Sequence, residues 1–134
     1  MREIIFRAKR IDNKEWLYGS LVCRVKKDAE GCKTDECEIF DSPYRRYVDP
    51  ETVGEFTGMF DRDGNKIFGG DIIKSRDYHG KRFGYVDYPE GHSAWFLCGI
   101  DAFSDEYLLN QSETEIIGNI FDNPELLAVP HENN

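Results

Sequence analysis

The stretch FTGMFDRDGNKIFGGDIIK, residues Phe56–Lys74, decides the fold that the sequence predicts. Its first five residues, Phe56–Phe60, are rich in aromatic side chains and favour a β-strand. An Asp-Gly pair follows within Asp61–Lys66, where glycine adopts a positive φ at little cost and so favours a tight turn. Ile67–Phe68 resumes the apolar character, and after a glycine pair the run Asp71–Lys74 begins another strand. We therefore expect a hairpin whose return strand leads directly into the next strand.

Strand patterns continue on both sides of this hairpin. Alternating apolar and polar residues, with a polar turn between two runs, predict an N-terminal hairpin over Arg2–Val25. Five short strand-like runs separated by glycine-bearing turns lie within 70–121, which favours a small SH3-like barrel or a rolled sheet. Asn123–Leu127 has proline at the first helical position and predicts one short helical turn. The expected fold is mainly β, an N-terminal β-hairpin joined to a small barrel, with a frayed tail over 130–134.

Residues 24–49 depart from this pattern. They are polar with interleaved charges, and only Cys37–Phe40 has the composition of a strand. We expect a long surface loop or a loosely packed hairpin, either a binding surface or a variable insertion. Asp49 precedes a proline and is expected to cap a single helical turn or a bend.

Three segments of the chain resemble the YopX-like proteins of phages and prophages. They are the central stretch Phe56–Ile73, the opening Arg2–Ala8 and the closing Glu115–Leu127. The three matches occur in the right order and reach both ends of the chain. The resemblance implies one small, mostly β domain over residues 1–129 and an oligomeric phage protein. It implies no activity, since the family has no established one and offers no catalytic residues to carry over.

Length and composition are those of one folded domain. The chain has 134 residues, of which 40% are hydrophobic and 13% aromatic, enough for a modest core. No apolar run approaches the length of a membrane span, and the N-terminus lacks a signal-peptide pattern. These features predict a protein of the bacterial host cytoplasm with no membrane partner.

The net charge of −9 is distributed unevenly along the chain. Residues 1–82 hold all 17 basic groups against 16 acidic ones, whereas residues 83–134 hold ten acidic groups and no basic one. A chain this acidic is a poor candidate for binding a nucleic-acid backbone over its whole surface.

The four cysteines, Cys23, Cys32, Cys37 and Cys98, fit no metal-site spacing. We expect free thiols in a reducing compartment, with Cys98 buried as a small hydrophobic residue. The alternative is a zinc site that adds His79, His92 or Cys98 to the first three cysteines.

Other patterns that could carry chemistry are weak. Asp61, Asp63 and Asn65 have the spacing that opens a calcium loop, but Lys66 and Ile72 stand where that loop needs glycine and glutamate. We therefore interpret these side chains as turn formers.

The three histidines, His79, His92 and His131, fall in predicted turns or in the tail, where a general base has no defined cleft. The chain contains no phosphate loop, nucleophile elbow or dinucleotide fingerprint. The sequence thus predicts no catalytic, cofactor or metal site and favours a protein that is not an enzyme.

Two function hypotheses follow. The leading one is a non-catalytic binding protein whose acidic C-terminal half meets a basic patch on a host or phage protein, or on a second copy of the chain. Tyr107 or Phe121 would supply apolar burial in such a homo-oligomer. The alternative is an accessory protein that binds single-stranded nucleic acid through basic and aromatic loops. The candidate partner-binding residues are Arg24, Lys26, Lys27, Tyr44, Arg45, Arg46, Tyr47, Glu113, Glu115, Asp122 and Glu125.

Overall fold

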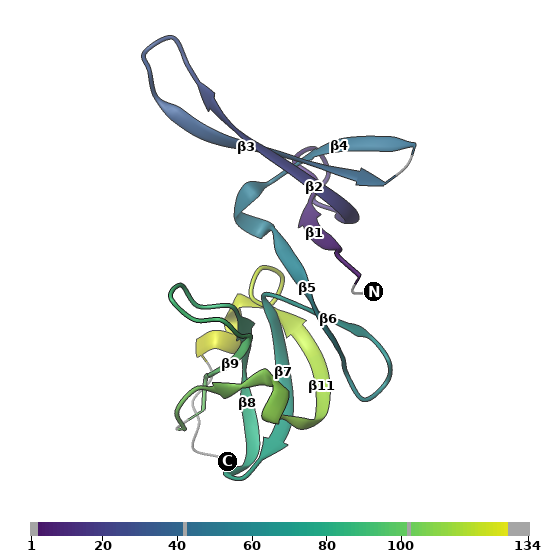
Figure 1. The fold of residues 1–134 in the computed structure, drawn as a ribbon, viewed down its shortest axis with the longest axis vertical. Helices are drawn as coiled ribbons and strands as arrows, with labels where there is room; N and C mark the ends of the chain where they lie inside the picture. Colours follow the sequence, from purple (N-terminus) through teal and green to yellow (C-terminus); the bar gives the residue numbers. More distant parts are fainter. Residues whose placement is uncertain (1–2, 42, 102, 129–134) are drawn as a thin grey trace. The chain divides into compact units, whose positions relative to one another are not determined.

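The computed structural model describes residues 3–41, 43–101 and 103–128 of the chain. These residues form a mainly β structure in which two antiparallel sheets are accompanied by three short 3-10 turns. The chain divides into two compact units, residues 1–56 and residues 57–134. The ribbon colours in Figure 1 follow the sequence, from purple at the N-terminus to yellow at the C-terminus, so the strands of each unit can be traced in chain order.

The first unit is built from an antiparallel meander. Its four strands are β1 (Phe6–Lys9), β2 (Trp16–Lys27), β3 (Lys33–Asp41) and β4 (Tyr44–Val48). The sheet continues from β1 to β5 (Gly54–Phe60) and then to β6 (Lys66–Phe68), in the order β4-β3-β2-β1-β5-β6. The predicted N-terminal hairpin is confirmed by the β1–β2 pair, although Arg2 lies outside the described residues.

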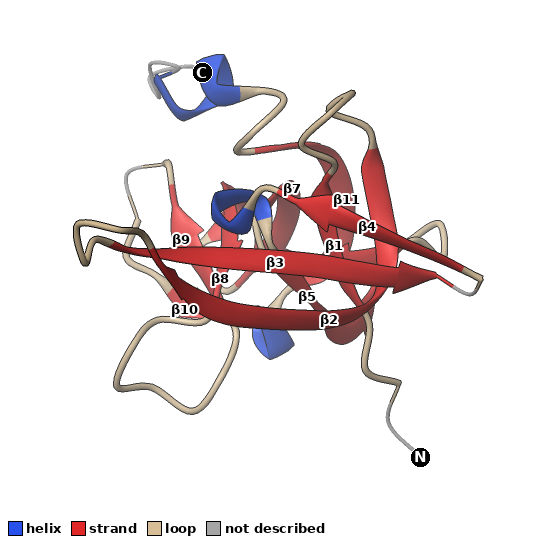
Figure 2. Cartoon of the chain, turned by 90° about the horizontal axis from the view of Figure 1, so that it is seen from above, coloured by secondary structure: helices blue, strands red, loops and turns tan. Residues whose placement is uncertain are grey.

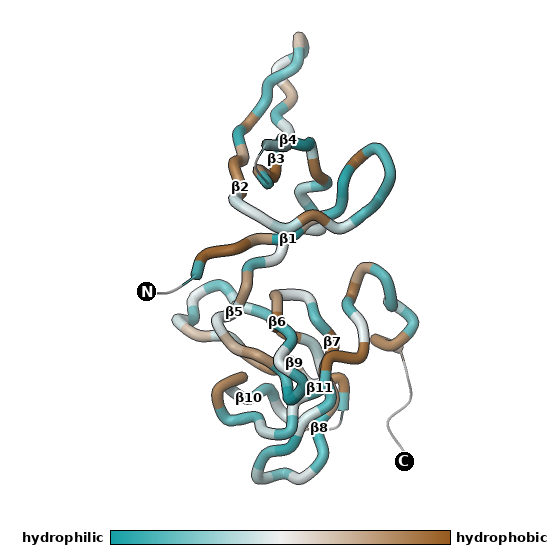
Figure 3. Tube along the Cα trace, turned by 90° about the vertical axis from the view of Figure 1, so that its right-hand side faces the viewer, coloured by the Kyte–Doolittle hydropathy of each residue, from teal (hydrophilic) through white to brown (hydrophobic). Residues whose placement is uncertain are grey.

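One face of this sheet forms the core of the first unit. Ala8, Cys37, Ile39 and Val48 are buried there, and Leu17, Leu21 and Val53 pack against them. These side chains come from alternate positions of their strands, because successive residues of a strand point to opposite faces. Figure 3 shows that β2 contains both hydrophobic and hydrophilic residues.

Of the two conformations expected for residues 24–49, a long surface loop or a loosely packed hairpin, the structure shows the hairpin. Ser20–Lys27 of β2 pair residue by residue with Lys33–Phe40 of β3, and β3 pairs in turn with β4. Figure 2 shows β2 and β3 side by side along their length. Beyond Leu21 every residue of β2 is exposed. Because this part of the hairpin buries little on either face, its sequence lacks the apolar alternation by which strands are recognised. Ser42, between β3 and β4, lies outside the described residues.

The second unit holds the five-stranded sheet. Its strands are β7 (Asp71–Asp77), β8 (Gly80–Asp87), β9 (Phe96–Gly99), β10 (Glu106–Tyr107) and β11 (Ser112–Asn119). The order is β10-β9-β8-β7-β11, so the end strands β10 and β11 do not pair and the sheet is open. The five predicted strands are present, but a closed SH3-like barrel is not formed among the described residues.

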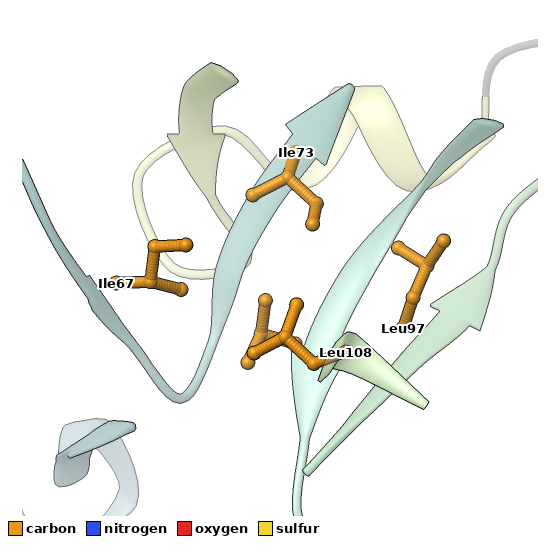
Figure 4. Packing of buried hydrophobic residues seen from close by; sticks show 5 residues of the cluster. Ile67, Ile73, Leu97 and Leu108 are labelled. Atoms are coloured by element: carbon orange, nitrogen blue, oxygen red, sulfur yellow. The ribbon is translucent and has the colours of Figure 1, made fainter. Parts of the chain in front are cut away.

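The core of the second unit lies on one face of this sheet. Ile67, Ile73, Val86, Leu97 and Leu108 form it, and Figure 4 shows four of these side chains pointing toward one another. They come from the central hairpin, from three strands of the sheet and from the 3-10 turn η2 (Leu108–Asn110).

The turns agree with the sequence analysis. Gly64 has a φ of 85°, and the carboxylate of Asp61 accepts hydrogen bonds from the backbone N–H groups of Asp63 and Asn65. Asp49 caps the 3-10 turn η1 (Pro50–Thr52) by accepting from the N–H of Glu51. The predicted C-terminal helical turn is present as a third 3-10 turn, η3 (Pro124–Ala128), and the tail 130–134 lies outside the described residues.

Candidate binding site

A pocket of about 360 Å³ opens beside the core of the second unit. It is lined by Met59, Ala94, Trp95, Tyr107, Leu109 and Asn110, which we call the aromatic groove. Five of the six residues present apolar or aromatic side chains, and none is charged. A site of this composition and size can accept an apolar side chain of a ligand.

The 3-10 turn η2 determines which side chains reach the groove. Leu108 is buried in the core, and its backbone N–H donates to the carbonyl oxygen of Trp95 at 3.0 Å. Because Leu108 points inward, its neighbours project outward, and Tyr107 is 51% and Leu109 79% exposed. Large apolar side chains this exposed on a folded domain mark candidate contact surfaces.

Aromatic rings continue away from the groove along strands β9 and β10. The ring of Tyr107 lies 4.9 Å from that of Phe96, which lies 5.1 Å from the imidazole of His92. Trp95 makes an edge contact with Tyr88 at 5.2 Å. Tyr107 thus belongs both to the groove and to this aromatic row.

Carboxylates lie on the same side of the sheet as the aromatic row. Asp87 is directly opposite Phe96 and Phe96 is opposite Tyr107, so the three side chains share a face. The negative potential acts on Cys98, whose pKa is raised to about 11 by burial and by Asp105 and Asp87. The second unit as a whole carries 14 acidic and six basic groups.

A cluster of polar side chains surrounds Arg82, which is almost fully buried. Its guanidinium donates to Asp77 at 2.6 Å, to Asp101 at 3.0 Å and to the carbonyl of Ser104 at 2.7 Å. Burial acts to raise the pKa of Asp77, yet hydrogen bonds from Gln111, from the backbone N–H of His79 and from Arg82 lower it to about 2. With its charges paired internally, this cluster holds β7, β8 and the loop after β9 together.

The predicted histidines lie in loops, as expected. The imidazole Nδ1 of His79 is 3.2 Å from Asp77, and its ring contacts Tyr78 and Phe103. His92 contacts Phe96. His131 lies outside the described residues.

The structure separates the predicted partner-binding residues into three groups. Arg24, Lys26, Arg45 and Tyr47 share the face of the β2–β3–β4 sheet opposite the core, whereas Lys27, Tyr44 and Arg46 point to the core side. The acidic residues Glu113, Glu115, Asp122 and Glu125 are all exposed in the second unit. Of these, Glu113 pairs with Arg76 at 3.2 Å.

The prediction of four free thiols is wrong. Cys23 and Cys37 form a disulfide, because the β2–β3 register places them directly opposite one another with their Cα atoms 4.1 Å apart. Cys32 is free and exposed, and Cys98 is free and buried as predicted. The zinc alternative loses two of its ligands to this bond, and no cluster of three metal-binding side chains occurs within residues 3–41, 43–101 and 103–128.

Sequence reasoning identified only Tyr107 among the residues of the groove. Met59, Ala94, Trp95, Leu109 and Asn110 come from segments far apart in the sequence, and no local pattern links them. The pair Leu108-Leu109 was a signal for an exposed apolar residue. Adjacent residues of a tight 3-10 turn point in different directions, so only one of the two leucines can be buried in the core.

Both the sequence and the fold of this chain resemble known proteins. The family described as YopX protein matches residues 5–128. This chain belongs to the YopX family. The crystal structure of protein EF1440 from Enterococcus faecalis resembles this YopX chain with a TM-score of 0.53 and 25% sequence identity, over 95% of this chain and 99% of that one. None of the curated proteins matches it. No helix among the described residues is both long and apolar enough to cross a membrane.

Proposed function

We propose that this chain is a non-catalytic interaction protein that uses the aromatic groove of its second unit. The occupant is a segment of a partner protein with an apolar side chain next to lysine or arginine. The observation that carries the proposal is the groove itself, an uncharged aromatic pocket whose lining residue Tyr107 shares a sheet face with Asp87.

Apolar burial supplies the affinity in this proposal, and charge supplies the selection. Burying a leucine-sized side chain contributes roughly 2 kcal/mol, and exposed ion pairs about 0–1 kcal/mol each. The carboxylate of Asp87, on the sheet face that Tyr107 shares, favours basic partners by attraction and disfavours acidic ones by repulsion. Residues 83–134 contain no lysine or arginine that could compete for this carboxylate.

Three further expectations belong to the same proposal. The protein comes from a phage or prophage and acts in the bacterial cytoplasm, the second unit is rolled in the manner of an SH3-like barrel, and the chain self-associates. The second unit, with 14 acidic and six basic groups, supports self-association, because its carboxylates can pair with individual basic side chains of a second copy.

The test uses intrinsic fluorescence. The chain has two tryptophans, Trp16 and Trp95, so Trp16→Phe leaves the groove tryptophan as the sole reporter. The probes are short peptides that contain one leucine beside two arginines, and matched peptides with two glutamates. We expect the basic peptides to change Trp95 emission in a saturable way and the acidic peptides to have no effect.

Two leucine variants locate the binding site. Leu109→Ala removes a groove side chain and is expected to weaken basic-peptide binding at least about fivefold, or roughly 1 kcal/mol. Leu127→Ala removes an equally apolar, exposed side chain outside the groove and should leave affinity unchanged. Equal losses in both variants, or no saturable response to any peptide, would overturn the proposal.

A further inference from the structure

The sheet of the first unit has a second face, opposite its core, which we call the outer face. The core side chains Cys37 and Ile39 occupy odd positions of β3, so the even positions point the other way. The β1–β2, β2–β3 and β3–β4 registers carry this alternation across four strands without a break. The outer face therefore carries the odd-numbered residues of β1 and β4 and the even-numbered residues of β2 and β3.

Three aromatic side chains stand exposed on adjacent strands of the outer face. Tyr18 on β2 is 47% exposed, Phe40 on β3 is 38% exposed and Tyr47 on β4 is 52% exposed. Phe40 is opposite Ser20 and Arg45, and Tyr47 is opposite Glu38. Tyr18 lies two residues before Ser20, the partner of Phe40, and Tyr47 is diagonal to Phe40 across β3–β4, so the three rings follow one diagonal across the outer face, which we call the platform.

A buried carboxylate fixes the cations beside this platform. Glu38 is only 2% exposed, although it lies on the outer face, because two arginines cover it. Arg45 donates to Glu38 at 2.6 and 3.0 Å, and Arg24 donates at 2.7 Å. Arg24 and Lys26 are also held by Glu36, at 2.8 and 3.1 Å. The guanidinium groups are thus oriented before any ligand arrives.

The charge balance of the outer face is opposite to that of the whole chain. On strands β1–β4 the outer face carries Lys9, Arg24, Lys26 and Arg45, and also Arg7, which is buried, against the two carboxylates Glu36 and Glu38, while the chain carries a net charge of −9. Arg45 also lies 5.0 Å from the centre of the Phe40 ring. A sheet face with exposed rings and a local excess of arginine and lysine suits a ligand that combines planar groups with negative charge.

We propose that the outer face binds single-stranded nucleic acid. Bases stack on Tyr18, Phe40 and Tyr47, and phosphates contact Arg24, Lys26 and Arg45. Unpaired bases suit the site because every base offers a face for stacking, whereas a duplex presents only its backbone and groove edges. The site is separate from the aromatic groove, which lies wholly in the second unit, and the two activities can fail independently.

The charge count sets the expected salt dependence. Three phosphate contacts on a single strand give a slope of about −2 for the logarithm of the association constant against the logarithm of salt concentration. The acidic remainder of the chain opposes long-range attraction, so binding is modest and depends on stacking. Binding that does not depend on salt concentration would contradict the proposed phosphate contacts.

The test measures fluorescence anisotropy of labelled oligothymidylate and oligouridylate with the full chain, over a range of salt concentrations. Strand β4 supplies a matched pair of variants, because Tyr47 lies on the outer face and Tyr44 on the opposite face of the same strand. We expect Tyr47→Ala to weaken binding about tenfold, as for the loss of one stacked base, and Tyr44→Ala to leave it unchanged. Lys26→Gln and Lys27→Gln form a second pair, in which only the former should lower the salt slope by about 0.7.

Trp16 provides an independent readout. In a Trp95→Phe background it is the sole tryptophan, and it lies on the outer face opposite Lys9. We expect oligonucleotide to change its emission with the affinity measured by anisotropy. No binding at low salt, or equal losses in Tyr47→Ala and Tyr44→Ala, would overturn the proposal. An outer face that instead joins two copies would also overturn it, and light scattering would show Tyr47→Ala dissociating them while oligonucleotide binding is unaffected.

Discussion

At the scale of single residues, the positions most sensitive to substitution are those where the backbone conformation or a buried charge permits few other side chains. Gly64 is one, since the turn between β5 and β6 needs its φ of 85°. Glu38 and Asp77 are two others, since each is a nearly buried carboxylate surrounded by donors. Their energetic effects are local and separable from one another.

Gly64→Val is expected to destabilise the protein by roughly 1–2 kcal/mol. No atom lies within 4 Å of a Cβ added at this position, so the cost is backbone strain and not a clash. Urea unfolding measures it. Gly64→Asn serves as the control, because asparagine tolerates a positive φ and should cost less. Equal losses in the two variants would contradict the strain argument.

Acid should destabilise the protein through Glu38 and Asp77. Hydrogen bonds from Arg45 and Arg24 lower the pKa of Glu38 to about 2, and the pKa of Asp77 is also about 2. The unfolded chain binds these protons first, so the stability they contribute is complete above about pH 5 and is lost as pH falls through about 2. Melting temperatures measured between neutral and strongly acidic pH test this.

Asp77→Asn supplies the comparison for this pH dependence. The variant should be less stable at neutral pH and should lose less stability on acidification than the unmodified chain. An acid profile as steep as that of the unmodified chain would assign the pH dependence to other carboxylates.

At the scale of elements, the β2–β3 hairpin is the least self-sufficient part of the fold. Two strands alone bury too little to be stable in water. The Cys23–Cys37 disulfide joins the two strands next to the core residues Leu21 and Ile39, where the hairpin leaves the sheet. The disulfide therefore restrains the exposed part of the hairpin, which begins where contact with the core of the first unit ends.

Removal of this bond should lower stability by up to about 3 kcal/mol, the loop-entropy value for a separation of 14 residues. Cys23→Ser tests it by urea unfolding, with Cys32→Ser as the control that leaves the bond intact. Alkylation of the denatured chain without reductant should modify two thiols, Cys32 and Cys98. In the native chain only the exposed Cys32 should react quickly. Four modified thiols in the denatured, unreduced protein would contradict the pairing.

At the scale of the whole molecule, the two units differ in charge. The second unit holds 14 acidic and six basic groups, whereas the first holds 12 acidic and 11 basic groups and gathers five cations on its outer face. Contacts between copies can pair basic residues of the first unit that point away from the outer face, Lys27 and Arg46, with the exposed carboxylates of the second unit.

We expect the chain to self-associate at micromolar concentrations, with apolar burial as the driving force and charge as the selector. Light scattering after gel filtration, at low and at high salt, measures this. Salt should shift the equilibrium toward the monomer by weakening the exposed ion pairs. A monomer in both buffers would exclude self-association, and an oligomer indifferent to salt would exclude the role of charge.

The sequence by itself determined the features that depend on neighbouring residues. The Asp-Gly turn around Gly64, the cap at Asp49, the N-terminal hairpin and the succession of short strands in the second unit are all encoded within a few residues. So is the burial of Cys98, which stands within an apolar strand. Each follows from backbone conformations and apolar periodicity, which act locally.

Only the tertiary structure decided the features that depend on register between distant strands. The pairing of Cys23 with Cys37, the division of Tyr44 and Tyr47 between opposite faces, and the assembly of the aromatic groove all require knowledge of which residues stand opposite one another. A shift of one residue in the β2–β3 register would separate Cys23 from Cys37 and turn the side chains of one strand to the other face. Long-range packing fixes that register, and no local pattern in an exposed, polar hairpin reveals it.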